Sequence, residues 1–116
     1  MSFGSPACDY AENSLDLNRL LINHPVATYF MKMQGDALKN AGIFSGDILV
    51  VDRSLPAADH KLIIAELNGE LTARRFRTRD GNSFLLGEDG HTPPYRLGRK
   101  DRFSVWGVIT SVIRKI

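Results

Sequence analysis

The feature that most constrains the fold is the pair Asn68-Gly69, which stands between two segments with the composition of strands. These segments are Leu62 to Leu67 and Leu71 to Phe76. An Asn-Gly pair suits a two-residue hairpin turn, because both central residues of that turn have positive φ. The sequence therefore predicts an antiparallel hairpin here, and with it a fold based on a sheet.

Other segments with strand composition occur on both sides of the hairpin. They are Ala27 to Met33, Ile48 to Asp52, Ser83 to Leu86 and Phe103 to Ile113. The last one is rich in β-branched residues, and Gly107 within it indicates a bulge or a close approach of another backbone. We therefore expect a mostly β protein in which Gly87 to Pro94 and Gly98 to Arg102 are loops.

One short helix is predicted near the start of the chain. Asp16 is a suitable N-cap for a helix that carries three leucines and ends before Pro25, because the residue before a proline disfavours the helical region. Residues 1–13 lack periodic hydrophobicity and are interpreted as a flexible arm. With 116 residues, 43% of them hydrophobic, the rest fits one domain, residues 14–116. A turn or short helix is expected at Ala37 to Ala41.

Composition narrows the class of protein. The single cysteine, Cys8, excludes an internal disulfide and suits a reducing cytoplasm. No apolar run approaches the ~18 residues that span a bilayer, so we expect a cytoplasmic protein without membrane contact. A net charge of +2 does not by itself indicate nucleic-acid binding. The cations that gather in the second half are interpreted as solvated strand faces and a loop: Arg74, Arg75, Arg77, Arg79, Arg96, Arg99, Lys100 and Arg102.

Three motifs connect the chain to a known family. They are Gln34-Gly35-Asp36-Ala37-Leu38, Gly46-Asp47-Ile48-Leu49-Val50-Val51-Asp52 and Gly69-Glu70-Leu71-Thr72-Ala73-Arg74-Arg75. Shorter matches are Ser5-Pro6-Ala7, Asp16-Leu17-Asn18, His24-Pro25 and Trp106-Gly107-Val108-Ile109-Thr110. From Phe3 to Val112 the chain resembles the LexA/UmuD self-cleaving serine peptidase family, most closely its UmuD branch. Departures at His60-Lys61 and Gly4 affect the expected turn geometry and leave the expected fold unchanged.

The resemblance implies the family's signal-peptidase-like β fold with one short N-terminal helix, and it implies a lost active site. In that family the position of Ala37 is a serine nucleophile, and the position of Arg74 is the lysine that acts as its base. Alanine has no oxygen for attack. A guanidinium stays protonated below pH ~12, so Arg74 cannot accept a proton. We therefore expect a degenerate dyad and no self-cleavage.

The resemblance also implies a role in the SOS response. The processed form of UmuD lacks an N-terminal tail, and Phe3-Gly4-Ser5-Pro6-Ala7 here follows directly on Met1-Ser2, as expected for a chain encoded in that form. Natural loss and engineered inactivation would both give this pattern. The implied partners are a second copy of the chain, a UmuC-type DNA polymerase, the recombinase (RecA) filament and, in a heterodimer, an intact UmuD. DNA would be met only indirectly, with no cofactor and no metal.

The last strand is the candidate dimer interface, because the C-terminal strands of the resembled family lie there. Its candidate contact residues are Val105, Trp106, Val108, Ile109 and Val112. The alternative is that the same residues form an internal core strand.

Two other functions are compatible with parts of the sequence. An active protease with another nucleophile would draw on Ser45, Ser54 or Thr72 together with His24, His60 or His91, although no spacing places these groups in contact. A repressor dimerisation domain is the second alternative. The UmuD-like opening from Phe3 to Tyr10 argues against it.

Overall fold

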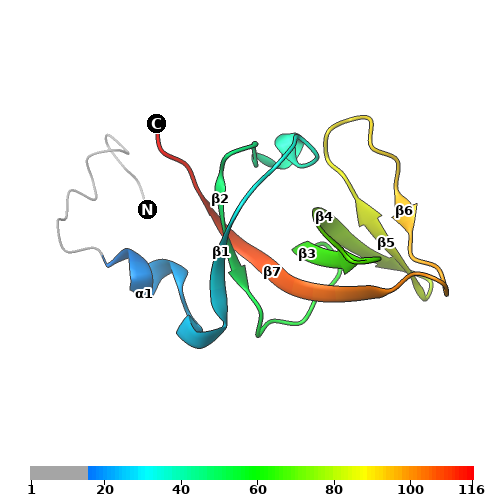
Figure 1. The fold of residues 1–116 in the computed structure, drawn as a ribbon, viewed down its shortest axis with the longest axis horizontal. Helices are drawn as coiled ribbons and strands as arrows, with labels where there is room; N and C mark the ends of the chain where they lie inside the picture. Colours follow the sequence, from blue (N-terminus) through cyan, green and yellow to red (C-terminus); the bar gives the residue numbers. More distant parts are fainter. Residues whose placement is uncertain (1–15) are drawn as a thin grey trace, which may run out of the picture.

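The computed structural model describes residues 16–116, which form a seven-stranded antiparallel sheet preceded by one short helix (Figure 1). The strand order is β1-β2-β7-β3-β4-β5-β6. The elements are α1 (Leu17–Leu21), β1 (Thr28–Lys32), β2 (Ile48–Asp52), β3 (Leu62–Leu67), β4 (Glu70–Arg79), β5 (Asn82–Leu86), β6 (Tyr95–Arg96) and β7 (Phe103–Ile113). Single 3-10 turns occupy Pro25–Ala27 and Lys39–Ala41. The predicted mostly β fold is confirmed, whereas the predicted arm, residues 1–13, lies outside the described residues.

The long strand β7 joins the two halves of the sheet. Its second half pairs with β2, its first half pairs with β3, and Val108 has a partner in both strands. In Figure 1, β1 and β2 accordingly lie on one side of the molecule and β3 to β6 on the other, with β7 running between them. The structure thus makes β7 an internal strand of the sheet. From Ile109 to Ile113, however, it has a strand neighbour among the described residues on one side only.

The turn chemistry agrees with the sequence where glycine and asparagine dictate it. Asn68 and Gly69 have φ of 51° and 88°, as the hairpin requires. The bounds of β2, β3 and β7 are as predicted. At α1 the Asp16 carboxylate accepts a hydrogen bond of 3.0 Å from the Asn18 N–H, which confirms the predicted cap.

The predicted bounds of β1, β4 and β5 need correction, and one further strand was not predicted. β5 begins one residue earlier than predicted, at Asn82. β1 begins at Thr28, after the 3-10 turn that Pro25 initiates, and ends at Lys32. β4 starts at Glu70 and runs on to Arg79, because β5 pairs with it as far as Arg79 opposite Asn82. The strand β6 was not predicted. Its two exposed residues pair with β5 and carry no alternating pattern that could announce a strand.

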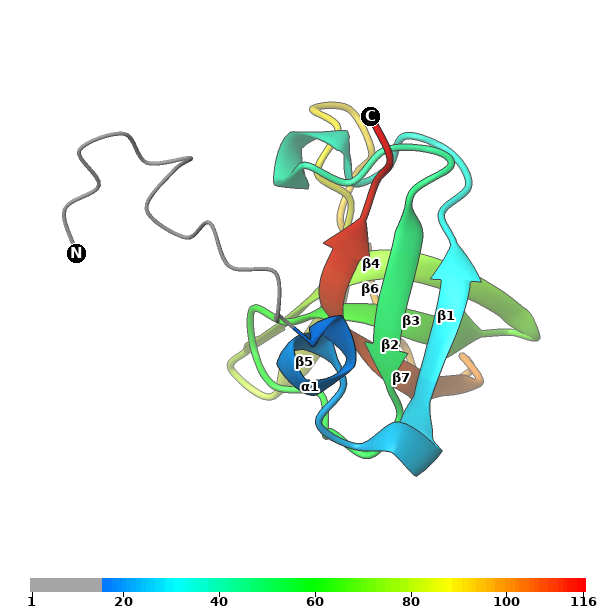
Figure 2. The same cartoon turned by 90° about the vertical axis from the view of Figure 1, so that its left-hand side faces the viewer.

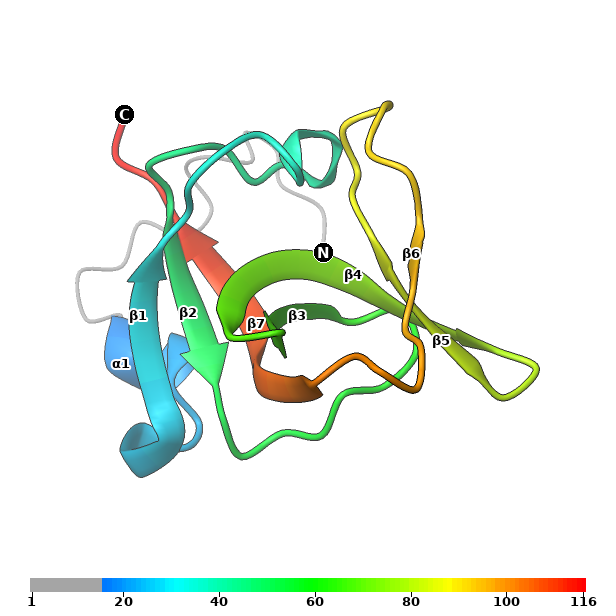
Figure 3. The same cartoon turned by 45° about the vertical axis from the view of Figure 1, so that its right-hand side comes forward.

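The sheet encloses two separate cores, because alternate residues of β3 and β4 face opposite sides. The first core contains Met33, Leu38, Ile43, Leu49, Val51, Ile64 and Ala73, and the second contains Ile63, Ala65, Phe76, Leu85 and Val108. The strand β4 curves strongly between them before its hairpin with β5 extends outward (Figure 3). Ala73 and Phe76 of β4 are accordingly buried in different cores, so neither face of this strand is a single inner side.

Gly107 fulfils both roles that the sequence suggested. The pairing of β7 with β3 shifts by one residue beside it, so Trp106 is the extra residue of a bulge. A Cβ at position 107 would stand 2.5 Å from Cγ1 of Val51, which leaves no room for a side chain. β2 and β7 consequently pack closely at the point where the two halves of the sheet meet. Figure 2, in which β1, β2 and the end of β7 run side by side, shows this half from its outer side.

Candidate functional site

Ala37 lies on the turn that follows β1, where the backbone is held in a defined conformation. Gly35 and Gly42 bound this turn with φ of 83° each, a region that L residues rarely adopt. Next to Ala37, the Leu38 side chain is fully buried in the first core. Its burial anchors the turn and leaves the Ala37 side chain half-buried.

The backbone around Ala37 is tied to the loop that follows β5. The Glu88 N–H donates to the Ala37 carbonyl at 2.6 Å, and the Asn40 N–H donates to the Glu88 carbonyl at 2.8 Å. On the other flank the Gly35 N–H donates to the Ser45 hydroxyl at 3.3 Å. The segments on both sides of residue 37 therefore have partners far away in the sequence.

The Glu88 side chain connects this loop to β4. Its carboxylate accepts a hydrogen bond from Nη2 of Arg75 at 2.6 Å and from Nε at 3.2 Å. Such a bidentate pair fixes direction as well as distance. The connection runs from residue 37 through Glu88 to Arg75, the neighbour of Arg74.

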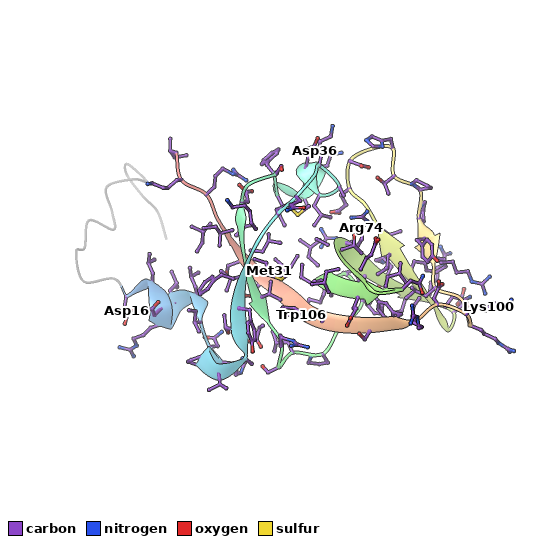
Figure 4. The ribbon with its side chains drawn as sticks, in the orientation of Figure 1. Asp16, Met31, Asp36, Arg74, Lys100 and Trp106 are labelled. Carbon is purple, nitrogen blue, oxygen red and sulfur yellow. The ribbon has the colours of Figure 1, made fainter. Side chains whose placement is uncertain are left out.

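Arg74 itself is half-buried, and within the described residues its guanidinium makes one hydrogen bond, in which Nη1 donates to the Ala73 carbonyl at 2.8 Å. Within residues 16–116, no hydrogen bond or ion pair joins its guanidinium to residues 35–38. Arg74 lines a cavity of about 370 Å³ together with Met31, Gln34, Leu49, Ile64 and Thr72. In Figure 4 Arg74 lies on β4, below the turn that carries Asp36.

Among the other candidate nucleophiles, Ser54 shares a carboxylate with His24. The Ser54 hydroxyl donates to Oδ1 of Asp52 at 2.6 Å, and Nδ1 of His24 lies 2.5 Å from Oδ2. The Ser54 hydroxyl hydrogen bond, with that of His24, holds the pKa of Asp52 below its usual range. A serine nucleophile must give its proton to a base such as histidine. Here the Asp52 carboxylate lies between the Ser54 hydroxyl and the His24 imidazole, so the arrangement is not a Ser-His pair.

The remaining candidates are dispersed. Ser45 supports the Gly35 backbone, and Thr72 lines the same cavity as Arg74. His60 lies 3.2 Å from Asp59, and His91 lies 3.4 Å from Asp89. Within residues 16–116, no hydrogen bond joins one of these hydroxyls to one of these imidazoles. Sequence reasoning missed the roles of Asp52 and Glu88, because His24 is 28 residues away from Asp52 and Arg75 is 13 residues away from Glu88.

The five candidate interface residues of β7 differ in their surroundings. Val108 is buried in the second core, and Val105 packs against that core. Trp106, Ile109 and Val112 pack against the first core and are half-buried. Ile109 and Val112 lie in the part of β7 that has a strand neighbour on one side only.

The described residues contain neither a cluster of metal ligands nor a membrane-spanning helix. Residues 16–116 contain no group of three or more His, Cys, Asp or Glu side chains that could hold a metal ion. No helix in the same part of the chain is long and apolar enough to cross a membrane.

Comparisons with known proteins agree with the fold and the motifs. The model of the peptidase S24-like family matches residues 1–110. Protein ImpA of Salmonella typhimurium is 38% identical over 113 residues, which cover 97% of this chain and 77% of ImpA. Protein MucA of Escherichia coli is 34% identical over 109 residues, 93% of this chain and 74% of MucA. The LexA repressor of Acidithiobacillus ferrooxidans is 34% identical over 110 residues, 91% of this chain and 53% of the repressor.

Proposed function

The chain belongs to the peptidase S24-like family, and from that premise we propose that it is a non-catalytic, UmuD-like binding subunit of SOS mutagenesis. In this role it forms a homodimer that joins a UmuC-type DNA polymerase in error-prone repair and meets the RecA filament. Family membership and the similarity to ImpA and MucA over most of each chain support the role.

The observation that carries the proposal is the chemistry at positions 37 and 74. An alanine methyl offers no nucleophile, and a guanidinium is a permanent cation that cannot serve as a base. Loss of either member of a catalytic pair removes most of the rate, so the two losses together leave only binding.

The scaffold around the absent chemistry is intact, which supports a function in assembly. Leu38 is fully buried, and Glu88 ties the Ala37 backbone to β4. A turn fixed in this way presents a constant surface, and a constant surface lowers the ordering cost of binding a partner.

A homodimer has a suitable surface on the outer side of β1, β2 and β7. Phe30, Ile48 and Ile113 share that face and are 58%, 40% and 38% exposed. Beside them, one edge of β7 from Ile109 to Ile113 has no strand partner within residues 16–116, and such edges recruit further strands. We infer that a second copy covers this outer face and the neighbouring edge of β7. Ile109 and Val112 contribute their backbone to that edge while their side chains pack against the first core, and the buried Val108 is excluded.

The first experiment tests the absence of chemistry. The purified chain is incubated with RecA filaments, single-stranded DNA and nucleotide, and separately with a fluorophosphonate probe. We expect intact mass and no labelled serine. The Ala37→Ser/Arg74→Lys double variant is the matched control for a restored site. Cleavage or labelling of the unaltered chain would refute the non-catalytic part of the proposal.

The second experiment tests the role. Expression of the chain in cells lacking the resident UmuD should restore mutagenesis after DNA damage when a UmuC-type polymerase is present. Failure to do so with abundant, folded chain would refute the SOS role. Titration into intact UmuD tests the heterodimer: slower UmuD cleavage at excess chain supports it, and an unchanged rate contradicts it.

A further inference from the structure

Basic side chains gather on β6 and on the segment that connects it to β7, at the end of the molecule opposite α1. This basic loop, residues 95–102, carries Arg96, Arg99, Lys100 and Arg102, all exposed. Lys100 projects outward at one end of the molecule, whereas Asp16 lies at the other (Figure 4). From the sequence alone, these cations are interpreted as part of a solvated loop. The contacts within the loop indicate a more specific arrangement.

The one carboxylate of the basic loop is turned toward the protein. Asp101 accepts hydrogen bonds from the Gly98 N–H at 2.8 Å, the Asn68 amide at 3.1 Å and the Tyr95 hydroxyl at 2.8 Å. These donors, the Gly98 N–H first among them, keep the pKa of Asp101 below its usual range. Because its acceptor oxygens are engaged internally, the ionised carboxylate does not pair with the neighbouring cations.

The basic loop is also held at both ends. The Asn68 side chain accepts from the Arg102 N–H at 2.9 Å, and the Asn68 N–H donates to the Arg102 carbonyl at 2.8 Å. At the other end the Leu97 N–H donates to the Ser83 carbonyl at 2.9 Å, and Arg96 reaches the Asn82 amide oxygen at 2.9 Å. The backbone that presents the cations is therefore ordered before any ligand binds.

The cations of this loop lack acidic partners within the described part of the chain. None of the four forms an ion pair there, whereas Arg75, Arg77 and Arg114 all do. Glu66 shares a surface hollow with Arg102, but the two form no ion pair, and the Glu66 carboxylate accepts a hydrogen bond from the Ser104 hydroxyl at 3.3 Å. The positive charge of Arg96, Arg99, Lys100 and Arg102 is therefore directed to the solvent.

The surroundings favour nucleic acid over an acidic protein as the ligand. Protein interfaces have an apolar centre, but the only large hydrophobic side chain exposed on this loop is Tyr95, which is 43% exposed. A surface that presents arginine and lysine side chains without an apolar centre is typical of contacts to phosphates. An exposed aromatic ring beside them can stack on an unpaired base. Both features point to a single strand.

We propose that the basic loop binds single-stranded nucleic acid, with Arg99, Lys100 and Arg102 on phosphates and the Tyr95 ring against a base. This contact goes beyond the proposed function, in which DNA is met only through other proteins. It does not depend on that function, because it requires neither the residue at position 37 nor the residue at position 74.

The test measures fluorescence anisotropy of a labelled oligodeoxythymidine of about 30 nucleotides across a salt series. Single strands lose about 0.7 of a log unit in affinity per log unit of salt for each phosphate neutralised. Three contacts therefore predict a slope of about −2 for the unaltered chain. The Arg99→Gln/Lys100→Gln/Arg102→Gln variant should bind at least tenfold more weakly at low salt, with a slope close to zero.

The matched control is Arg19→Gln/Lys39→Gln/Lys115→Gln, which removes the same charge from exposed positions elsewhere. It should change affinity less than twofold. Equal weakening by both variants, with both folded by circular dichroism, would show a diffuse charge effect and overturn the proposal. Absence of binding by the unaltered chain at low salt would overturn it as well.

Tyr95 variants test the choice of ligand. Tyr95→Phe keeps the ring and should retain preference for single strands over duplex, whereas Tyr95→Leu should lose it. Competition by polyglutamate as effective as by oligodeoxythymidine of equal charge would assign the loop to an acidic protein and overturn the nucleic-acid proposal.

Discussion

Arg114, which follows the last residue of β7, grips the carboxylate of Asp47 with two hydrogen bonds of 2.7 and 2.6 Å. Its Nη2 also donates to the Gly42 carbonyl at 2.8 Å. The Phe44 N–H adds a further hydrogen bond to the same carboxylate at 2.8 Å. The end of the sheet thereby fastens residues 42–47, the loop that follows the turn of Ala37.

This pair predicts a specific acid sensitivity. The hydrogen bond from Arg114, followed by that from Phe44, lowers the pKa of Asp47 from 3.8 to about 2. A carboxyl with a lowered folded-state pKa stabilises the protein above its unfolded pKa, and this stabilisation is lost as pH falls from about 4 through 2. Asp47→Asn should therefore lower the urea midpoint at pH 7 by much more than at pH 2.5.

The matched control for that measurement is Asp80→Asn, because the Asp80 side chain is 91% exposed. Its urea midpoint should follow that of the unaltered chain at every pH. A destabilisation by Asp47→Asn that is the same at pH 7 and pH 2.5 would contradict the assigned pKa.

Gly107→Ala should destabilise the protein by overpacking. The added methyl would meet Cγ1 of Val51 at 2.5 Å, and such insertions into a packed core cost about 1 to 3 kcal/mol. Val51→Ala removes the obstructing methyl, so the double variant should be more stable than the sum of the single effects predicts. Chemical denaturation of the four proteins measures this coupling. Strict additivity would show that the two positions do not meet.

Arg75→Met should loosen the loop that holds the Ala37 backbone. A hydrogen bond between charged groups contributes about 1.5 to 3 kcal/mol, so the amides of Glu88 and Asn40 should exchange roughly tenfold faster or more. The Arg77→Met variant removes a comparable cation whose partner is Asp59, outside this connection. Hydrogen exchange read by NMR compares the two. If amide exchange is accelerated equally in both variants, the Arg75–Glu88 pair does not hold the turn of Ala37, and the prediction is contradicted.

Ile48→Lys should shift the proposed homodimer toward monomer. A lysine in the centre of the outer face would be buried in the dimer as a charge without a partner. We therefore expect the association constant of the dimer to fall at least tenfold. Leu71→Lys is the control, because Leu71 is 49% exposed on β4, away from this face. Sedimentation at micromolar concentrations gives the result. A dimer that persists in Ile48→Lys and dissociates in Leu71→Lys would relocate the interface.

Local chemistry explains which parts of the fold could be predicted. The cap at Asp16, the hairpin at Asn68-Gly69 and the bounds of β7 follow from neighbouring residues, and the structure confirms them. The strand β6 and the last residues of β4 could not be predicted, because their pairing with β5 supplies the order that their polar sequence lacks.

The connections around the candidate site also could not be predicted, because they join residues that are distant in the sequence. Arg114 and Asp47 are 67 residues apart, and Arg75 and Glu88 are separated by 13. Periodicity cannot reveal a partner at such separations. The two cores escaped prediction for the same reason, since alternation along β4 shows that it has two faces and does not show that both become buried.

The central place of β7 has a consequence for how the chain reaches its native state. The inner edges of β2 and β3 both face β7, although residues 53–102 separate β2 from it and residues 68–102 separate β3 from it. Contacts at such separation form late, because loop closure must precede them. During synthesis the β1–β2 and β3–β4 hairpins can each form early, but they stay apart with open edges until residues 103–113 emerge. Substitutions in β7 should therefore act on the rate of folding as well as on stability, and the protein is most exposed to misassembly just before that strand arrives.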